Sequence, residues 1–372
     1  MSGRGSSIID LIRPDIRDIE PYAAVEPVER LAARVGVPVE QVIKLDANEN
    51  PYGCSPSVQH ALAEFDGYHI YPDPLCSHIQ ELLQRYIGAP ADRIIVGNGS
   101  DEIIDIIMRL FLMPGEKVIV CPPTFGYYQS SADFCAAQVV RVPRKSDYRI
   151  DVDGVIDAID EHTKLVFIAS PNNPTGNTIS EHELYGILET GVVVVVDEAY
   201  GEFSGKTVLP LTEKDENLIV IRTFSKWAGL AGLRFGYGIF PASLVTYALR
   251  MKPPYNVNLA AQVAVRATLE DIDCLMDRVN LIRSERDRLY GGLEEMDFLV
   301  PYPSEGNFIL CRLLRGELGY VRQALESQGI FLRYYSDPLL HNCLRISVGR
   351  PEQNDVVLQK LRALGANLVE TQ

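Results

Sequence analysis

Long apolar runs are missing from this chain of 372 residues. The longest runs, such as residues 192–196, have the length of a strand, whereas a transmembrane helix needs roughly 20 apolar residues. Residues 1–20 also lack the apolar segment of a signal peptide, and their early acidic residues do not suit a transit peptide. We therefore expect neither a membrane span nor a targeting segment.

Positive charge is also scarce. The 35 Lys and Arg residues are outnumbered by 50 Asp and Glu residues, which leaves a formal net charge of −15. A negative surface disfavours non-specific binding to nucleic acid and to anionic membranes. It still allows a local basic pocket for an anionic metabolite, so we expect small-molecule partners, no nucleic acid and no membrane.

Cysteines are few and show no metal-binding pattern. Their number is odd, they are scattered along the chain, and none belongs to a CxxC pair. This distribution is typical of reduced thiols in a cytoplasmic enzyme and predicts no metal cluster. The seven are Cys54, Cys76, Cys121, Cys135, Cys274, Cys311 and Cys343.

Apolar runs alternate with helical patterns along most of the chain. Runs that are apolar throughout suit strands buried on both faces of a mostly parallel sheet, and the helical patterns between them complete βαβ units. After residue 255 the pattern changes to one or two long helices at 258–296, followed by strands with helices between them, which indicates a smaller α+β domain. The predicted strands are residues 43–45, 94–96, 118–120, 139–142, 165–169, 192–196, 218–221, 237–240, 308–311, 331–333 and 344–348.

Unusual polar residues follow several of these strands, at the sheet edge where α/β proteins bind ligands. Lys226, after residues 218–221, is either a surface lysine or a buried amine with a lowered pKa that acts as a nucleophile. Asp197 directly follows residues 192–196 and either ends a strand at the surface or meets a buried cationic partner. The helix start at 99–101 is either an ordinary N-cap or an anion site.

Taken in order, these segments resemble the fold type I aminotransferases that depend on pyridoxal 5′-phosphate (PLP), and most closely the histidinol-phosphate aminotransferases. The resemblance rests on SPNNPTG (170–176), VVDEAY (195–200) and TFSKWAGLAGLRFGY (223–237). It continues in IEPY, LDANENPYG, GYHIYPDP, GNGSDE, CPPTFGYY, GNF and LRISVG, so that it covers nearly the whole chain. It implies a three-layer αβα large domain with a mostly parallel sheet and a smaller α+β domain. With the change near residue 255, the expected division is an arm and part of the small domain at 1–45, the large domain at 46–255 and the small domain at 256–372.

The resemblance also implies a role for each matching residue. Lys226 would bond to the PLP aldehyde and move the substrate proton, Asp197 would keep the ring nitrogen protonated, and Tyr200 is the third residue that it implies to be catalytic. Asn173 and Tyr200 would bind the ring 3-oxygen, and Phe125, where these enzymes often have Tyr, would stack on the ring. The phosphate ligands would be Gly99, Ser100, Asp101, Thr223, Ser225 and Arg234, joined by Tyr71 from the second subunit of a homodimer.

Substrate choice is expected to depend on other positions. The implied substrate residues are Tyr22, Asn48, Arg333 and Arg345. Arg345 would clamp a carboxylate, since the guanidinium fork suits that group, and Arg333 would bind a substrate phosphate or else pair with Asp337.

The implied reaction is L-histidinol phosphate + 2-oxoglutarate ⇌ imidazole-acetol phosphate + L-glutamate, with ping-pong kinetics through pyridoxamine phosphate. Two alternatives of the same fold remain open: an aromatic amino acid aminotransferase, and a PLP-dependent decarboxylase of a phosphorylated amino acid. From another class, a PLP-sensing regulator would need a DNA-binding module, and the arm before LDANENPYG is too short for one.

Overall fold

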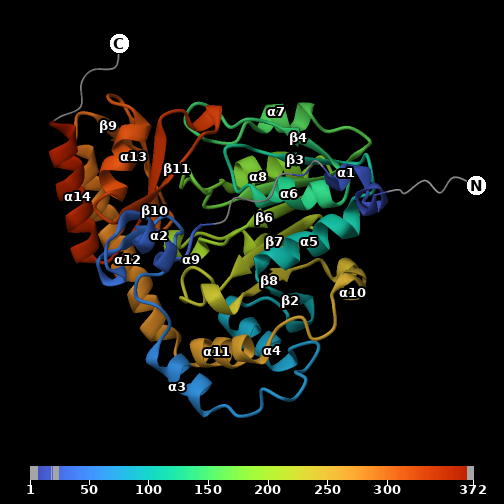
Figure 1. The fold of residues 1–372 in the computed structure, drawn as a ribbon. Coiled ribbons are helices and arrows are strands. Elements are labelled where there is room, and N and C mark those ends of the chain that lie inside the picture. The colour runs from blue at the N-terminus through green and yellow to red at the C-terminus, as the bar shows by residue number, and fades with distance from the viewer. Residues whose placement is uncertain (1–6, 18, 20–24, 367–372) are drawn as a thin grey trace, which may run out of the picture.

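The computed structural model describes residues 7–17, 19 and 25–366, and its centre is a seven-stranded sheet (Figure 1). The strand order is β2-β8-β7-β6-β5-β3-β4, and every neighbouring pair is parallel except the two that involve β8. The mostly parallel sheet predicted from the sequence is confirmed. The strands are β2 (Ile94–Asn98), β3 (Lys117–Val120), β4 (Gln138–Arg141), β5 (Thr163–Ala169), β6 (Val193–Asp197), β7 (Leu218–Thr223) and β8 (Phe235–Ile239).

Helices cover both faces of this sheet, because its central strands are apolar on both sides. Val194 and Val196 pack into one hydrophobic cluster, while Val195 packs into the cluster on the opposite face, as the two-residue period of a strand requires. The first face carries α3 (Pro56–Glu64), α4 (Ser77–Ile87), α7 (Val152–Asp157), α8 (Glu181–Leu188) and α11 (Leu259–Glu270), and the opposite face carries α5 (Ser100–Phe111), α6 (Tyr127–Phe134) and α10 (Ala242–Met251). The three-layer αβα arrangement is therefore confirmed.

A second sheet of five strands forms the other lobe, on the left of Figure 1. Its order is β1-β11-β12-β10-β9, so β1, which precedes the whole large sheet in the chain, completes its edge by pairing parallel to β11. The predicted smaller α+β unit is present, although the short strand β9 was not predicted. Its elements are β1 (Ile43–Leu45), β9 (Leu299–Pro301), β10 (Phe308–Leu313), β11 (Ile330–Tyr334), β12 (Cys343–Ser347), α13 (Leu318–Glu326) and α14 (Pro351–Gly365).

The long helix α12 (Ile272–Glu294) joins the two lobes. Leu275 and Val279 pack in the core of the large sheet, whereas Leu289 and Leu293 pack in the core of the small one. The division of the chain at residues 45 and 255 stays a prediction, since α11 and the start of α12 still pack on the large lobe. The remaining helices of the described residues are α1 (Pro14–Arg17), α2 (Val28–Val35) and α9 (Gly201–Ser204), with 3₁₀ turns at Ile8–Leu11, Val39–Gln41, Ala91–Arg93, Leu209–Glu213, Ala231–Leu233 and Pro338–Leu340.

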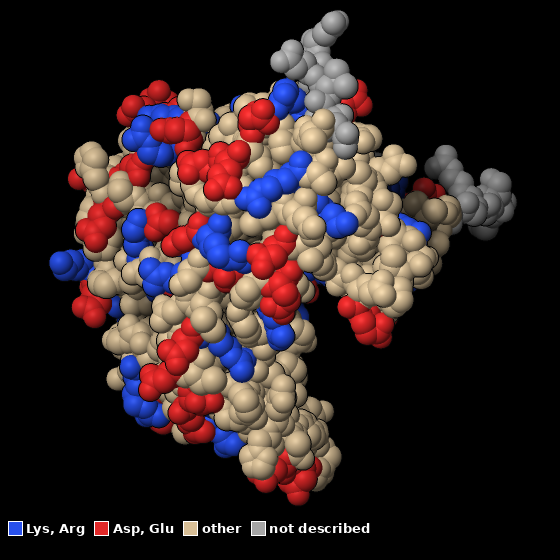
Figure 2. Space-filling model, turned by 90° about the vertical axis from the view of Figure 1, so that its left-hand side faces the viewer, with Lys and Arg blue, Asp and Glu red and all other residues tan. Residues whose placement is uncertain are grey.

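Charges of both signs are interspersed on the face that carries α14, and they do not gather into a basic patch (Figure 2). Neighbouring charges pair across α12 and α14, as in Arg288 with Asp355 at 2.6 Å and Arg362 with Glu295 at 2.8 Å. Within the described residues, no helix is long and apolar enough to cross a membrane.

Candidate active site

A cavity of about 430 Å³ lies where the ends of the large sheet's strands face the small sheet. It brings together most of the residues singled out in the sequence, although they come from distant parts of the chain. Those that line it are Asn48, Ser100, Asp101, Phe125, Asn173, Asp197, Tyr200, Thr223, Ser225, Lys226, Arg234, Arg333 and Arg345.

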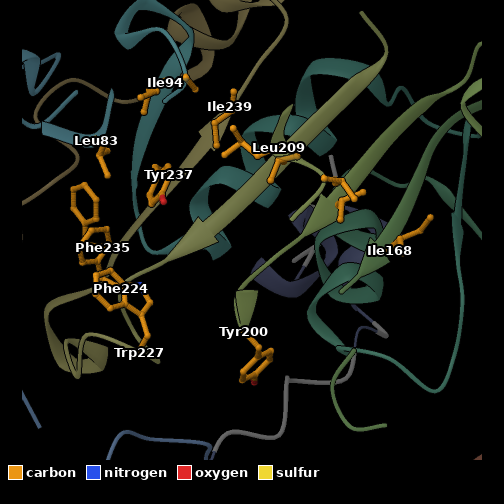
Figure 3. Close-up of a cluster of buried hydrophobic side chains, with 14 of the residues drawn as sticks. Leu83, Ile94, Ile168, Tyr200, Leu209, Phe224, Trp227, Phe235, Tyr237 and Ile239 are labelled. Carbon is orange, nitrogen blue, oxygen red and sulfur yellow. The ribbon is translucent and has the colours of Figure 1, made fainter. Parts of the chain in front are cut away.

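Lys226 reaches this cavity because its neighbours anchor the turn after β7. Phe224 and Trp227 are fully buried and point into the core, as Figure 3 shows, so the lysine between them projects the other way. Its Nζ donates to the carbonyl oxygen of Ala47 at 3.0 Å. Burial, together with the nearby Arg345 guanidinium, lowers the pKa of Lys226 to about 8. About a tenth of this amine would therefore be neutral and nucleophilic at pH 7, far more than for an ordinary lysine.

Asp197 is the last residue of β6 and is buried at the floor of the cavity. Its carboxylate accepts hydrogen bonds from the Tyr128 hydroxyl at 2.7 Å and from the Ala199 backbone N–H at 3.0 Å. Burial outweighs these donors and raises its pKa to about 6. Among the described residues, this buried acid has no cationic partner. A cationic ring nitrogen beside Asp197 would be such a partner and would stabilise the charged carboxylate.

A cradle of donors surrounds the first turn of α5. The hydroxyls of Thr223 and Ser225 lie 2.9 Å apart, and the Arg234 guanidinium donates to Asp101 at 2.6 Å. Gly99 precedes the helix at φ +83°, and a Cβ there would lie 2.5 Å from Nη2 of Arg234. Only glycine lets the backbone approach so closely, and the free N–H groups of the helix start suit a phosphate.

Asn173 and Tyr200 line the cavity between Lys226 and the small sheet. The Tyr200 hydroxyl accepts from Asn48 Nδ2 at 2.9 Å, and the Asn173 side-chain oxygen accepts from Arg345. Asn48 also accepts from Ser347 on β12, at 2.9 Å, so its buried amide joins the two lobes. Burial raises the pKa of Tyr200 to about 12, which keeps its hydroxyl protonated.

Two arginines from adjacent strands of the small sheet close the cavity. Arg333 on β11 lies directly opposite Arg345 on β12 in the strand pairing. Arg345 is buried, donates to the carbonyl oxygen of Asp46 at 2.6 Å, and has an Nε that is buried without a hydrogen bond. A buried guanidinium with spare donors is suited to an anionic ligand.

Three predicted residues are not in the cavity lining. Gly99 lies behind it, where it makes room for Arg234. Tyr71 is 80% exposed and stacks on Tyr255 with ring centroids 4.7 Å apart. Tyr22 falls outside the described residues, although Val25, shortly after it, lines the cavity.

Sequence reasoning missed several cavity residues. Tyr128 is the donor to Asp197, and its only signal was that it is the third aromatic residue in CPPTFGYY. Phe125, from the same segment, was named from the sequence and lines the cavity with its ring edge-on to Tyr128, at a centroid separation of 5.5 Å. Arg141 also lines the cavity and was not named from the sequence, and Asp337, named only as a possible partner of Arg333, lines it too.

This donor set fits PLP on three observations of the structure. A buried carboxylate lacks a cationic partner among the described residues, a lysine with a lowered pKa lines the same cavity, and a cradle beside Gly99 holds two hydroxyls and a guanidinium. These correspond to the ring nitrogen, the aldehyde and the phosphate of the cofactor.

Comparison with known proteins identifies the family. Residues 40–361 match the family model described as aminotransferase class I and II. Histidinol-phosphate aminotransferase of Dehalococcoides mccartyi is 48% identical, with 95% of this chain and 98% of that protein covered. The Roseiflexus castenholzii enzyme of the same name is 47% identical, with 96% and 99% covered. The crystal structure of histidinol-phosphate aminotransferase from Sinorhizobium meliloti, in complex with pyridoxal-5′-phosphate, superposes with a TM-score of 0.84 at 26% identity and covers 95% of this chain and 98% of that one.

Proposed function

Because the chain belongs to the class I and II aminotransferase family and is a PLP-dependent enzyme, we propose that it interconverts L-histidinol phosphate and 2-oxoglutarate with imidazole-acetol phosphate and L-glutamate. The structural observation that carries the substrate choice is the pair Arg333 and Arg345, opposite each other on adjacent strands in the cavity that holds Lys226. Glutamate needs two cationic sites, and histidinol phosphate needs one that accepts a phosphate.

We assign the residues that would hold PLP from the family resemblance and from the lining of this cavity. Lys226 would hold the aldehyde carbon, Asp197 would face the ring nitrogen, and Phe125 would cover the ring. Asn173 and Tyr200 would bind the 3-oxygen, and the backbone at Gly99, Ser100 and Asp101 would hold the phosphate together with Thr223, Ser225 and Arg234. When bound, PLP supplies an electron-withdrawing ring that takes up the electron pair released as the substrate loses its α proton.

The chain's own side chains move the proton and orient the substrate. Once the substrate amine has replaced it on the aldehyde carbon, the freed Lys226 amine, whose pKa burial lowers to about 8, would take the proton from the substrate α carbon. Arg345 binds the α-carboxylate of glutamate with its two-nitrogen fork, and Arg333 binds the distal anion of either substrate. Asn48 keeps the Tyr200 hydroxyl in place through its 2.9 Å hydrogen bond. Because both substrates use this one cavity in turn, the kinetics are ping-pong.

The same proposal includes a homodimer. Tyr71 is exposed in a loop that also exposes Tyr68 and Ile70, which is unusual for three large side chains on a free surface. Docking of this loop on a second copy would cover them and bring Tyr71 to the neighbouring cofactor phosphate. The arm tyrosine, Tyr22, would close over the substrate. Free thiols at all seven cysteines are consistent with the cytoplasm as the compartment.

Single-turnover absorbance of the lysine-bound cofactor tests the substrate. Mixing the holoenzyme with L-glutamate and, separately, with L-histidinol phosphate should bleach the cofactor band, and the reverse oxo acids should restore it. A response to phenylalanine but not to histidinol phosphate would instead identify an aromatic amino acid aminotransferase. Release of carbon dioxide from phosphothreonine would identify the decarboxylase.

A further inference from the structure

Arg141 is a third arginine at the substrate end of the cavity, and the roles assigned so far do not use it. It is the last residue of β4, the edge strand of the large sheet, and its side chain is 50% exposed. Among the described residues, its guanidinium pairs with one carboxylate, Asp337, at 3.8 Å, which is too long for a hydrogen bond. An exposed pair at this distance is weak, so the guanidinium is free to reorient.

Asp337 holds this pair at a defined place beside Arg333. It follows Arg333 by four residues, in the loop after β11, and caps the 3₁₀ turn Pro338–Leu340 by accepting from the Leu339 N–H at 2.9 Å through Oδ1. The other oxygen, Oδ2, faces Arg141. The carboxylate is thus anchored by the small lobe, while the arginine belongs to the large one.

The charges around the cavity show why a third arginine is useful. Asp46 pairs with Lys44 at 2.9 Å, Asp101 pairs with Arg234 at 2.6 Å, and Asp337 pairs with Arg141. The charged residues that line the cavity are Asp46, Asp101, Arg141, Asp197, Lys226, Arg234, Arg333, Asp337 and Arg345. Arg345 already donates to the carbonyl oxygen of Asp46 and to Asn173, so Arg333, opposite it, would carry most of the contact with a distal anion.

The two proposed substrates differ in that distal anion. The side-chain carboxylate of glutamate carries one negative charge, which one arginine balances. A phosphate monoester carries about 1.5 to 2 negative charges at pH 7, with a second pKa near 6, and offers three acceptor oxygens. A cavity that accepts both in turn therefore needs a cation that is available for one substrate and neutralised for the other.

We propose that Arg141 is a second phosphate-binding residue, held by Asp337 while glutamate occupies the cavity and released to the substrate when a phosphate occupies it. The inference rests on the proposed function, since it explains how one cavity serves a phosphorylated and a dicarboxylic substrate. No bond forms or breaks in this exchange. Arg141 trades a weak ion pair for a charge-assisted contact with the phosphate.

The test compares the Arg141→Ala holoenzyme with the wild type for both substrates between pH 5.5 and 8. At pH 8 the variant should raise KM for histidinol phosphate roughly tenfold, with kcat little changed, and KM for glutamate less than about threefold. The increase in KM for histidinol phosphate in the variant should be smaller at pH 5.5, where the phosphate is mostly a monoanion. Asp337→Asn, which frees Arg141, should strengthen inhibition by inorganic phosphate severalfold.

Arg149→Ala is the matched control, because Arg149 pairs with Asp147 at 2.7 Å, is exposed, and does not line the cavity. It should change neither KM. Equal effects of Arg141→Ala on both substrates, or an effect that does not depend on pH, would overturn the proposal. A second measurement, inhibition of the glutamate half-reaction by inorganic phosphate, tests Arg141 independently of the proposed function. If the wild type does not use histidinol phosphate, the proposed function fails. A roughly tenfold weaker phosphate inhibition in Arg141→Ala would still support the role of Arg141, and an unchanged inhibition would still contradict it.

Discussion

The cavity has two walls of different construction. The cofactor wall consists of Asp197, Thr223, Ser225 and Lys226, at the ends of the buried strands β6 and β7, together with Arg234, which directly precedes β8. The substrate wall consists of Arg141, Arg333, Asp337 and Arg345, from an edge strand, from two strands of the small sheet and from the loop between them.

The difference between the walls matches what each one holds. In the cofactor wall, the hydroxyls and carboxylates are hydrogen-bonded to fixed neighbours, such as Thr223 to Ser225 and Asp197 to Tyr128. In the substrate wall, Arg141 is half-exposed and loosely paired at 3.8 Å. A rigid wall suits one resident group, and an adaptable wall suits two substrates that exchange in every cycle.

Replacing Lys226 by Ala should have the largest effect, since it removes the proposed base and the cofactor attachment together. We expect kcat to fall by roughly a thousandfold or more. Borohydride reduction of the holoenzyme, followed by peptide mass mapping, should place the cofactor on Lys226. Lys145→Ala, which changes an exposed lysine paired with Asp151, should keep full activity. A label on any other lysine would show that the cofactor wall is wrongly assigned.

Replacing Asp197 by Asn should lower kcat by roughly a hundredfold or more, because a neutral amide cannot stabilise a protonated ring nitrogen.

Burial raises the pKa of Asp197 to about 6 in the folded chain from 3.8 in the unfolded one. Between these values the folded state keeps a proton that the unfolded state releases, so stability of the cofactor-free protein falls as pH rises. This cost, about 3 kcal/mol by pH 7, should be absent in Asp197→Asn.

Urea unfolding of the cofactor-free wild type and Asp197→Asn between pH 4 and 7 measures that difference. Tyr128→Phe is the control, because losing the hydroxyl donor raises the pKa of Asp197 further and moves the loss of stability to higher pH. If the difference in unfolding free energy between wild type and Asp197→Asn stayed constant across this pH range, that result would contradict a buried carboxyl with a raised pKa.

Replacing Arg333 and Arg345 separately should show that each arginine matters more for a different substrate. Arg333→Ala should lower kcat/KM for histidinol phosphate roughly 10- to 100-fold, and more than it lowers that for glutamate. Arg345→Ala should affect glutamate and 2-oxoglutarate more, since histidinol phosphate has no carboxylate. Steady-state kinetics with each substrate decide this, with Arg149→Ala as an exposed arginine control. An equal loss of kcat/KM for both substrates in both variants would mean that the substrate wall does not discriminate between the two anions.

Replacing Phe125 by Tyr should have the smallest effect, a change in kcat/KM of less than about threefold, because either ring presents the same stacking face. Phe125→Ala should instead weaken cofactor retention, which dialysis followed by absorbance of the remaining cofactor would measure. A large effect of the tyrosine variant would show that the ring edge, near Tyr128, is more crowded than the 5.5 Å centroid separation implies.

Much of the fold was predictable because its strands are strongly apolar. Residues 43–45 form β1, as expected, and the strand predicted at 331–333 lies within β11. The antiparallel direction of β8 was not predictable, since direction depends on which strands it pairs with. The short strand Leu299–Pro301 was also missed, because three residues with an exposed Val300 carry too little pattern.

Most of the cofactor wall was predictable from local sequence because its residues end or follow strands with a strong apolar pattern. Asp197 and Lys226 are examples, and the family resemblance named their roles. The substrate wall was predictable only in part. Arg333 and Arg345 were named, but Arg141 was not, because an arginine at the end of an edge strand has no local feature that distinguishes it from any surface arginine.

The sequence by itself determined the buried parallel strands, the place of Lys226 just after one of them, and the family. Each depends on residues close together in the chain, where apolar periodicity and turn chemistry act directly. Only the tertiary structure decided that β1 completes the small sheet, that Asn48 joins the two lobes, and that Asp337 faces Arg141 at 3.8 Å. These contacts join residues far apart in the chain, and only the packing of the two lobes around one cavity brings them together.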